Sequence, residues 1–241
     1  MSDSRAMSDV VGFVLIFAIV VTSVGVVTTF GVGALVDFRD AEAGNNAERG
    51  MVAVADAMDE VDRGRSPARS AELTVDRGTI GISDGVSFRV RYSNASTTYE
   101  ETYQTNALVY RLDGTNVAYE SGAVIRSGGD SSALSSSPSL RCSDDAAVVS
   151  LVRVRARGPS SVRGDTVRIE MRHQSSQLLF PQTNLSDAGV TVEATSPRQD
   201  SWTQYFEQAD GWQSDGPGTG VCEGVDRVVV RQTTISVRFV T

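Results

Sequence analysis

The most distinctive pattern in the chain is a long apolar run near its N-terminus. Residues 10–36 contain no charged side chain, and Asp9 and Asp37 bound the run. At about 1.5 Å of rise per residue, a helix of this length spans roughly 40 Å, enough to cross the hydrocarbon core of a bilayer with some tilt. A soluble helix is rarely apolar around its whole circumference for so long, and a cleaved secretory signal has a shorter apolar region. The pattern therefore predicts a transmembrane helix.

A second helical pattern follows the apolar run. Over residues 37–66 the apolar positions recur at helical spacing, with acidic and arginine residues between them. These positions are Ala41, Ala47, Met51, Val54, Ala55, Met58 and Val61. Gly64 and Pro67 indicate the end of the helix. We therefore expect an amphipathic stalk helix that continues from the transmembrane helix.

From about residue 70 to residue 241 the apolar positions alternate with polar ones. The alternation is clearest at residues 86–92, 152–157, 167–171 and 235–239. A period of two indicates antiparallel strands with one wet face. Seven or more short strands separated by Gly/Ser/Asn turns predict a β-sandwich-like domain. The expected fold class is thus α+β, with a long N-terminal helix followed by a mostly antiparallel β domain.

Three stretches interrupt the strand pattern. The Ser/Gly-rich residues 127–139 and the Gly/Pro segment 214–220 are expected to be exposed loops. Ser196-Pro197, followed by Trp202, Tyr205 and Phe206, predicts a short helix with proline at its first position. We expect the rings to pack on the sheet; the alternative is an aromatic patch that faces a ligand.

Composition narrows the functional classes. All 22 basic residues are arginines, and with 30 acidic residues the net charge is −8, which disfavours nucleic acid as a partner. Acidity without lysine is expected of a protein that lives in high salt, where screening weakens repulsion between carboxylates. A GC-rich codon bias gives the same composition, and the two explanations are compatible.

The sequence carries little catalytic or metal-binding chemistry. His173 is the single histidine, and no nucleophile elbow, phosphate loop or His/Cys metal spacing accompanies it. We therefore predict no enzyme activity, no cofactor and no metal site. Cys142 and Cys222 are a candidate disulfide pair in an exported domain; two independent buried thiols are the alternative.

Small residues mark one face of the apolar helix. Gly25, Thr29 and Gly33 are spaced by four positions. Such spacing lets two helix backbones approach closely in lipid, where the contact itself must supply the attraction. The face is thus a candidate site for packing against copies of the chain, although glycine and threonine are also common in membrane helices that do not pair.

The segment from Arg5 to Phe13, Arg-Ala-Met-Ser-Asp-Val-Val-Gly-Phe, resembles the start of archaeal type IV prepilins, in particular haloarchaeal pilin-like proteins. The resemblance implies a leader over residues 1–6, cleaved by a prepilin peptidase between Ala6 and Met7. The transmembrane helix, residues 7–36, would remain in the mature protein. The implied partners are the membrane, the peptidase, and copies of the chain or other pilins. Asp9 lies at the mouth of the helix rather than inside it, which leaves open whether the chain is a major or minor subunit.

The flanking charges do not fix the orientation. Arg5 precedes the apolar run, whereas Arg39 and Arg49 follow it, so the positive-inside rule gives no support to an outside C-terminal domain. Candidate N-glycosylation sites at Asn94 and Asn184, together with the cysteines, favour that placement. We therefore expect a single-pass protein of the cell membrane with residues 70–241 outside, which the resemblance would also allow to assemble into a surface filament.

Two functions from different classes follow. The first is a type IV pilin-like structural subunit of the cell surface. The second is a permanently anchored binding module for an envelope or extracellular ligand. Its site would lie at the aromatic helix or at the outward arginine rows 89/91, 153/155/157 and 168/172. Cross-strand ion pairs on a solvated face are the alternative role for these arginines.

Overall fold

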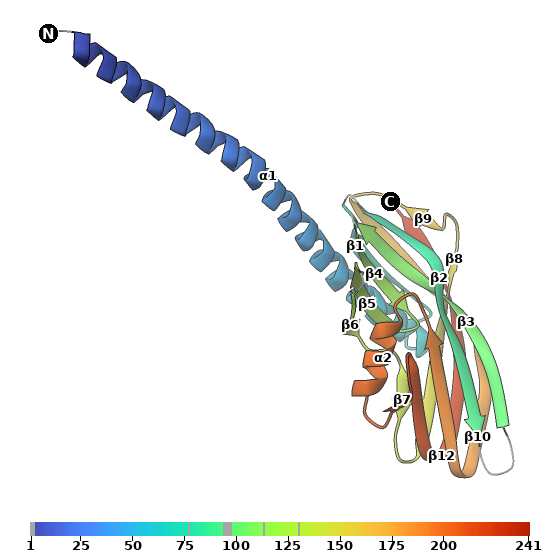
Figure 1. Ribbon diagram of the computed structural model, residues 1–241. Helices are drawn as coiled ribbons and strands as arrows, with labels where there is room; N and C mark the ends of the chain where they lie inside the picture. Colours follow the sequence, from blue (N-terminus) through green and yellow to red (C-terminus); the bar gives the residue numbers. More distant parts are fainter. Residues whose placement is uncertain (1–2, 77, 94–97, 113, 130) are drawn as a thin grey trace. The chain divides into compact units, whose positions relative to one another are not determined.

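The computed structural model describes residues 3–76, 78–93, 98–112, 114–129 and 131–241, and at 3–9, 37 and 180–187 it describes the backbone alone. The chain divides into two compact units, Met1–Glu42 and Ala43–Thr241, and helix α1 (Asp3–Asp62) runs without interruption from the first into the second (Figure 1). The predicted α+β class, with a long N-terminal helix before a mostly antiparallel β domain, is confirmed.

In the first unit, the apolar side chains of α1 are exposed on every side of the helix. Phe13 and Phe30 are 70% and 73% exposed. The most apolar window has a mean hydropathy of 2.9, and none of it is buried. This surface needs a nonpolar environment, because exposing a continuous hydrophobic cylinder to water is unfavourable. Among the described residues, α1 is the one helix long and apolar enough to cross a membrane.

In the second unit, the remainder of α1 is amphipathic, as its spacing predicts. Its apolar side chains at Ala47, Met51, Val54, Ala55, Met58 and Val61 are all buried. Ala41, predicted on the same face, belongs to the first unit and is exposed. The helix ends at Asp62, four residues before the predicted boundary at 66. Gly64, at φ 70°, takes a left-handed conformation that turns the chain toward the first strand.

The β domain is built from twelve strands. They are β1 (Ala68–Thr74), β2 (Thr79–Ser93), β3 (Thr98–Leu112), β4 (Thr115–Glu120), β5 (Ala123–Gly128), β6 (Ser131–Ser136), β7 (Leu140–Cys142), β8 (Ala146–Ala156), β9 (Ser161–Val162), β10 (Thr166–Thr195), β11 (Gln213–Ser214) and β12 (Thr219–Val240). Their main order is β6-β5-β4-β3-β2-β10-β12-β8-β7, and β1 pairs with β10. Among the described pairings, only β12 with β8 is parallel.

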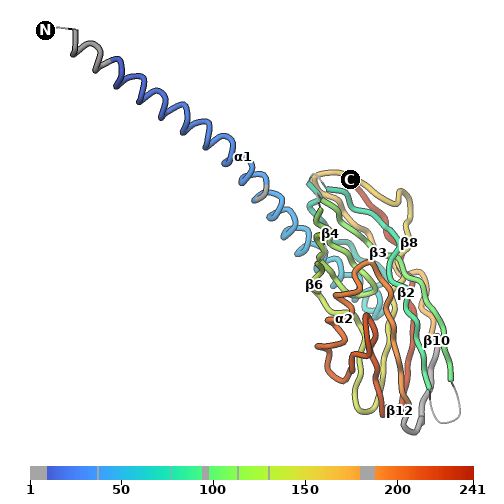
Figure 2. Tube along the Cα trace, in the orientation of Figure 1, coloured from blue at the N-terminus to red at the C-terminus, as the bar shows by residue number. Residues whose placement is uncertain are grey.

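The expectation of short strands is wrong for the middle of the sheet. β2 and β3 have 15 residues each, β12 has 22 and β10 has 30. Figure 2 shows these long segments running beside one another. Register shifts interrupt the ladders of β2 and β10 without ending the strands. A bulge lets a strand bend and twist while pairing continues, so the strands form one hydrogen-bonded sheet instead of two separate ones.

The long strands contribute to two large hydrophobic cores and, among the described residues, to a third small cluster of Ala107, Val109 and Ala118. One core joins the second part of α1 to inward residues of the sheet, including Ile169, Val237 and Phe239. The other core surrounds helix α2 (Gln199–Gln208), whose Trp202 and Phe206 are buried. The two ends of the long strands thus belong to different packing environments.

Three local predictions require correction. Segment 214–220, expected to be an exposed loop, begins in β11 and ends in β12; Ser214 pairs with Gly220, and Gly218 and Gly220 are buried. Residues 127–139, expected to be a loop, contain β6, which pairs with β5. The strand forms because serine tolerates an extended conformation when a neighbouring strand accepts its backbone hydrogen bonds. Proline does not occupy the first position of α2, which begins at Gln199. Instead the Arg198 backbone N–H donates to the Ser196 hydroxyl at 3.0 Å, so that Pro197 lies in the turn before the helix. The aromatic residues of α2 pack in the core, as expected.

Candidate functional site

The predicted helix-packing face is open on the isolated chain. Thr29 Oγ1 donates a hydrogen bond to the Gly25 carbonyl at 2.8 Å, within its own helix. Apart from the neighbouring residues and the nearby backbone of the helix itself, no described atom lies within 4 Å of a Cβ position built at Gly25 or Gly33. The face therefore offers backbone surface for close helix contact, with the threonine hydroxyl already satisfied. The candidate cleavage residues Arg5, Ala6 and Met7 belong to the first turns of α1.

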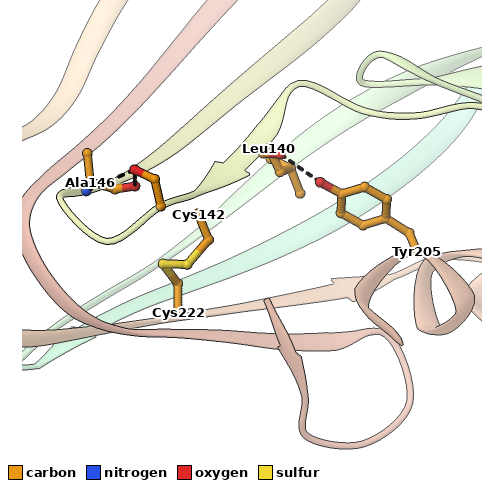
Figure 3. Close-up of a disulfide and its surroundings, with 6 residues drawn as sticks. Leu140, Cys142, Ala146, Tyr205 and Cys222 are labelled. Atoms are coloured by element: carbon orange, nitrogen blue, oxygen red, sulfur yellow. Dashed lines mark hydrogen bonds between the residues drawn. A yellow bond between two sulfur atoms is a disulfide. The ribbon is translucent and has the colours of Figure 1, made fainter. Parts of the chain in front are cut away.

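The two cysteines are joined in a disulfide. Cys142, at the end of β7, and Cys222, in β12, have an S–S distance of 2.03 Å and a Cα–Cα distance of 5.8 Å (Figure 3). Cys222 is fully buried. The bridge ties the edge strand β7 to a strand two places further into the sheet. It is a structural element of the core around α2.

Helix α2 is attached next to this bridge. The Tyr205 hydroxyl donates to the Leu140 carbonyl at 2.6 Å, as Figure 3 shows. Burial raises the pKa of Tyr205 to about 12, against a smaller lowering effect of Arg141. The phenol therefore stays protonated as a hydrogen-bond donor. Sequence reasoning identified the aromatic cluster but had no signal for the carbonyl that it binds.

An acidic cleft of about 700 Å³ lies between the end of α1, the residues around β7, and α2. Two of its carboxylates are paired: Asp59 accepts from Arg63 and Arg65 at 2.7 and 2.8 Å, and Asp62 accepts from Arg231 at 2.5 Å. Asp56 and Asp210 also line the cleft. In the described part of the chain, no group of three His, Cys, Asp or Glu side chains could hold a metal ion. Of these pairs, Asp62–Arg231 joins the end of α1 to β12.

A buried carboxylate holds the beginning of α2. Glu120, at the end of β4, is 0% exposed. It accepts hydrogen bonds from Arg198 at 2.6 Å, from the Trp202 indole at 3.0 Å and from Ser196 at 2.9 Å. A buried charge needs such partners, because desolvation without them is costly. The sequence offered no signal for this network, since its members are separated by more than seventy positions.

The predicted arginine rows have different outcomes. Arg91 is exposed, and among the described residues no carboxylate oxygen lies within 4 Å of its guanidinium group. Arg89 pairs with Glu193 at 3.1 Å, and Arg168 pairs with Glu72 at 2.9 Å, each on a neighbouring strand. These contacts confirm the ion-pair interpretation for both positions. Ion pairs this exposed contribute little to stability.

Arg153, Arg155, Arg157 and Arg172 behave differently. In the part of the chain that the structure describes, none of them lies within 4 Å of a carboxylate oxygen. They line two clefts of about 570 and 510 Å³, which share Arg157 and Ser236. The outward face of β8, β10 and β12 thus carries a strongly basic cleft surface on this acidic chain.

The other predicted positions add no chemistry. The sequon at Asn94 lies outside the described residues, and the side chain of Asn184 is likewise not described. His173 Nε2 lies 2.9 Å from the Ser176 hydroxyl, without a nucleophile-and-acid arrangement among the described residues around it. Nothing at these positions indicates catalysis.

Together these features define a protein with one N-terminal helix able to span a membrane and a disulfide-bridged, mostly antiparallel β domain, which is compatible with a membrane-anchored protein. The chain belongs to a family of unknown function, DUF7289, whose model matches residues 5–238. The match covers the apolar helix as well as the β domain. Comparison with curated proteins and with solved structures finds no match.

Proposed function

We propose that this protein is a membrane-anchored structural protein of the cell surface, a type IV pilin-like subunit processed by a prepilin peptidase. The observation that carries the proposal is the composition of α1. One uninterrupted helix presents an apolar surface from Val10 to Val36 and, from Ala47 to Val61, forms part of the core of the β domain. A helix of this kind is stable in lipid, and packing against copies of itself would shield the same apolar surface from water.

The orientation with the β domain outside is supported by the disulfide. Structural disulfides form and persist in oxidising compartments and are rare in the cytosol. The Cys142–Cys222 bridge therefore favours export of the β domain. The processing segment, which includes Arg5, would then face the cytoplasmic side, where prepilin peptidases of the resembled family act.

Mass spectrometry of the intact protein tests the processing step. The chain would be expressed in a haloarchaeal host, purified from membranes and sequenced from its N-terminus. We expect a mature chain that begins at Met7. An Arg5→Gln variant should retain its leader, whereas Arg39→Gln, a matched change beyond the apolar run, should be processed normally. A wild-type chain that still begins at Met1 or Ser2 would refute the assignment.

Electron microscopy tests assembly separately. An epitope tag after Thr241 would be labelled with gold on intact cells. Label along surface filaments is the expected result. Label confined to the cell envelope would contradict filament assembly and leave a single-pass anchored protein.

The arginine-lined clefts favour a second candidate function, an anchored binding module. This function is compatible with the same anchor and orientation. It does not require cleavage at Ala6 or the formation of filaments.

A further inference from the structure

We propose that the outward face of β1, β8, β10 and β12 binds a linear acidic polysaccharide. The proposed site, the arginine groove, consists of the two adjoining clefts described above. Six arginines and one glutamate line it: Arg69, Arg153, Arg155, Arg157, Arg172, Arg238 and Glu170. This function goes beyond the structural role proposed above and does not depend on processing or assembly.

Strand register places the guanidinium groups along a track. Arg155 on β8 lies opposite Ser236 on β12, which in turn lies opposite Arg172 on β10. Neighbouring strands are about 4.8 Å apart, and successive outward residues of one strand are about 6.6 Å apart. Arg153 and Arg155 are successive outward residues at the end of β8, so their charges repeat at that spacing, and Arg157 directly follows the last residue of the strand, Ala156. Such a series matches a polymer that carries charge at regular intervals.

The charge of the groove is not consumed within the protein. Glu170, its one acidic residue, pairs with Arg238 at 2.7 Å, and Arg69 pairs with Glu60 outside the groove lining. The remaining four arginines have no carboxylate partner among the described residues. Arg153 adds a second observation, because its Nε is buried without a hydrogen-bond partner. A buried donor without a partner is unfavourable, and an incoming acceptor would satisfy it.

The neutral lining of the groove favours a sugar polymer. Gln177, Gln232 and Thr234 lie among the arginines. Amide groups both donate and accept, and hydroxyls do the same, so these side chains suit the hydroxyl groups of a sugar. Guanidinium groups suit its carboxylates or sulfates, which they can bind through two parallel hydrogen bonds.

Two other classes of polyanion fit the groove less well. No aromatic residue is among the side chains that line the two clefts. Single-stranded nucleic acids rely on base stacking against aromatic rings, and protein interfaces derive most of their energy from aromatic and arginine anchors in dry pockets. A groove of arginine, glutamine and hydroxyl groups has neither rings for stacking nor an apolar centre. An acidic polysaccharide is therefore the partner that its chemistry favours.

Binding would be measured on the full-length protein in detergent micelles by isothermal titration calorimetry. The probes are polygalacturonate, which carries carboxylates, and heparin, which carries sulfates; neutral dextran and an oligo-dT strand are the comparisons. The test variant replaces Arg153, Arg155, Arg157 and Arg172 with glutamine. The control variant makes the same change at four exposed arginines outside the groove: Arg91, Arg111, Arg141 and Arg227. Both variants change the net charge equally, so loss through net charge alone would affect them alike.

We expect the wild type to bind at least one acidic polysaccharide and not dextran. The groove variant should bind it about tenfold more weakly or worse, while the control variant stays within about twofold of the wild type. Three outcomes would overturn the proposal: no binding to either acidic polysaccharide, equal losses in both variants, or binding of oligo-dT as tight as that of the polysaccharides. Far-ultraviolet circular dichroism of both variants would establish that each is folded.

Discussion

Removal of the disulfide should have the largest single effect on the stability of the β domain. Cys142 and Cys222 are separated by 80 positions. On the chain-entropy model, cross-linking a loop of this length stabilises the folded protein by about 4–5 kcal/mol, because the cross-link lowers the conformational entropy of the unfolded chain. Replacing the buried Cys222 with serine would add about 1–3 kcal/mol for a hydroxyl without a partner. The double alanine variant isolates the cross-link and is expected to lose about 4 kcal/mol.

The chain contains suitable reporters for this measurement. Its two tryptophans, Trp202 and Trp212, are both buried in the core around α2. A Cβ built at Gly211 would lie only 2.5 Å from the Cys142 carbonyl, so the segment before Trp212 packs directly on the bridged residue. Guanidinium unfolding of the full-length protein in detergent, followed by tryptophan fluorescence, would therefore report on the core that the bridge closes.

Reduction of the wild type supplies a matched control. Wild-type protein unfolded with a reductant present should become about as unstable as the double alanine variant. The reasoning is refuted if oxidised and reduced wild type unfold at the same guanidinium concentration, or if the double variant loses less than about 1 kcal/mol. Either result would mean that the cross-link does not restrict the unfolded chain.

Three further predictions concern the interior of the β domain. Glu120→Ala should lower the free energy of unfolding by about 3–5 kcal/mol, because it leaves a buried guanidinium and an indole N–H unpaired. Glu120→Gln should lower it by less. Equal unfolding midpoints for the alanine variant and the wild type would contradict this prediction. Burial raises the pKa of Tyr205 from 10.0 to about 12, so above pH 10 the phenol ionises more readily in the unfolded chain. The contribution of Tyr205 to the free energy of unfolding should therefore fall by about 2 kcal/mol between pH 10 and 12, so the Tyr205→Phe variant, titrated in parallel, should lose less stability than the wild type by about that amount. Burial also raises the pKa of Tyr103 and of Tyr119, and these two residues add to the fall in both proteins. Gly220→Ala would place a Cβ 2.0 Å from the Phe206 ring and should cost about 1–3 kcal/mol. Gly189→Ala, whose Cβ would lie 4.0 Å from the Ser93 hydroxyl oxygen, should unfold close to the wild-type midpoint.

Periodicity predicted the elements whose burial is set by local spacing. The apolar run and the buried positions of α1 from Ala47 to Val61 follow from one helical repeat, and the inward residues of β10 and β12 follow from alternation. These patterns are local, because each side chain faces the core according to its place in its own element. Strand length, by contrast, does not follow from local spacing. β10 continues through its register shifts because β12 supplies hydrogen bonds throughout, and that partner is distant in sequence.

The polar interior was not predictable for the same reason. Glu120 would be expected at the surface from its type, and only the positions of Arg198 and Trp202 explain its burial. The arginine rows were visible as outward residues, but which of them find carboxylates depends on strand order. Arg168 lies opposite Glu72 across the β1–β10 pair, whereas Arg155 lies opposite Ser236.

The point at which α1 passes from the first unit into the second determines where the protein can be cut. The compact unit that holds the β domain begins at Ala43, and its core includes α1 side chains from Ala47 onward. A protease that cleaves near Glu42 would release a soluble fragment with its hydrophobic interior complete. Cleavage beyond Met58 would remove one wall of that interior and expose its apolar residues to water. Release of an intact β domain is thus limited to cuts on the N-terminal side of Ala43.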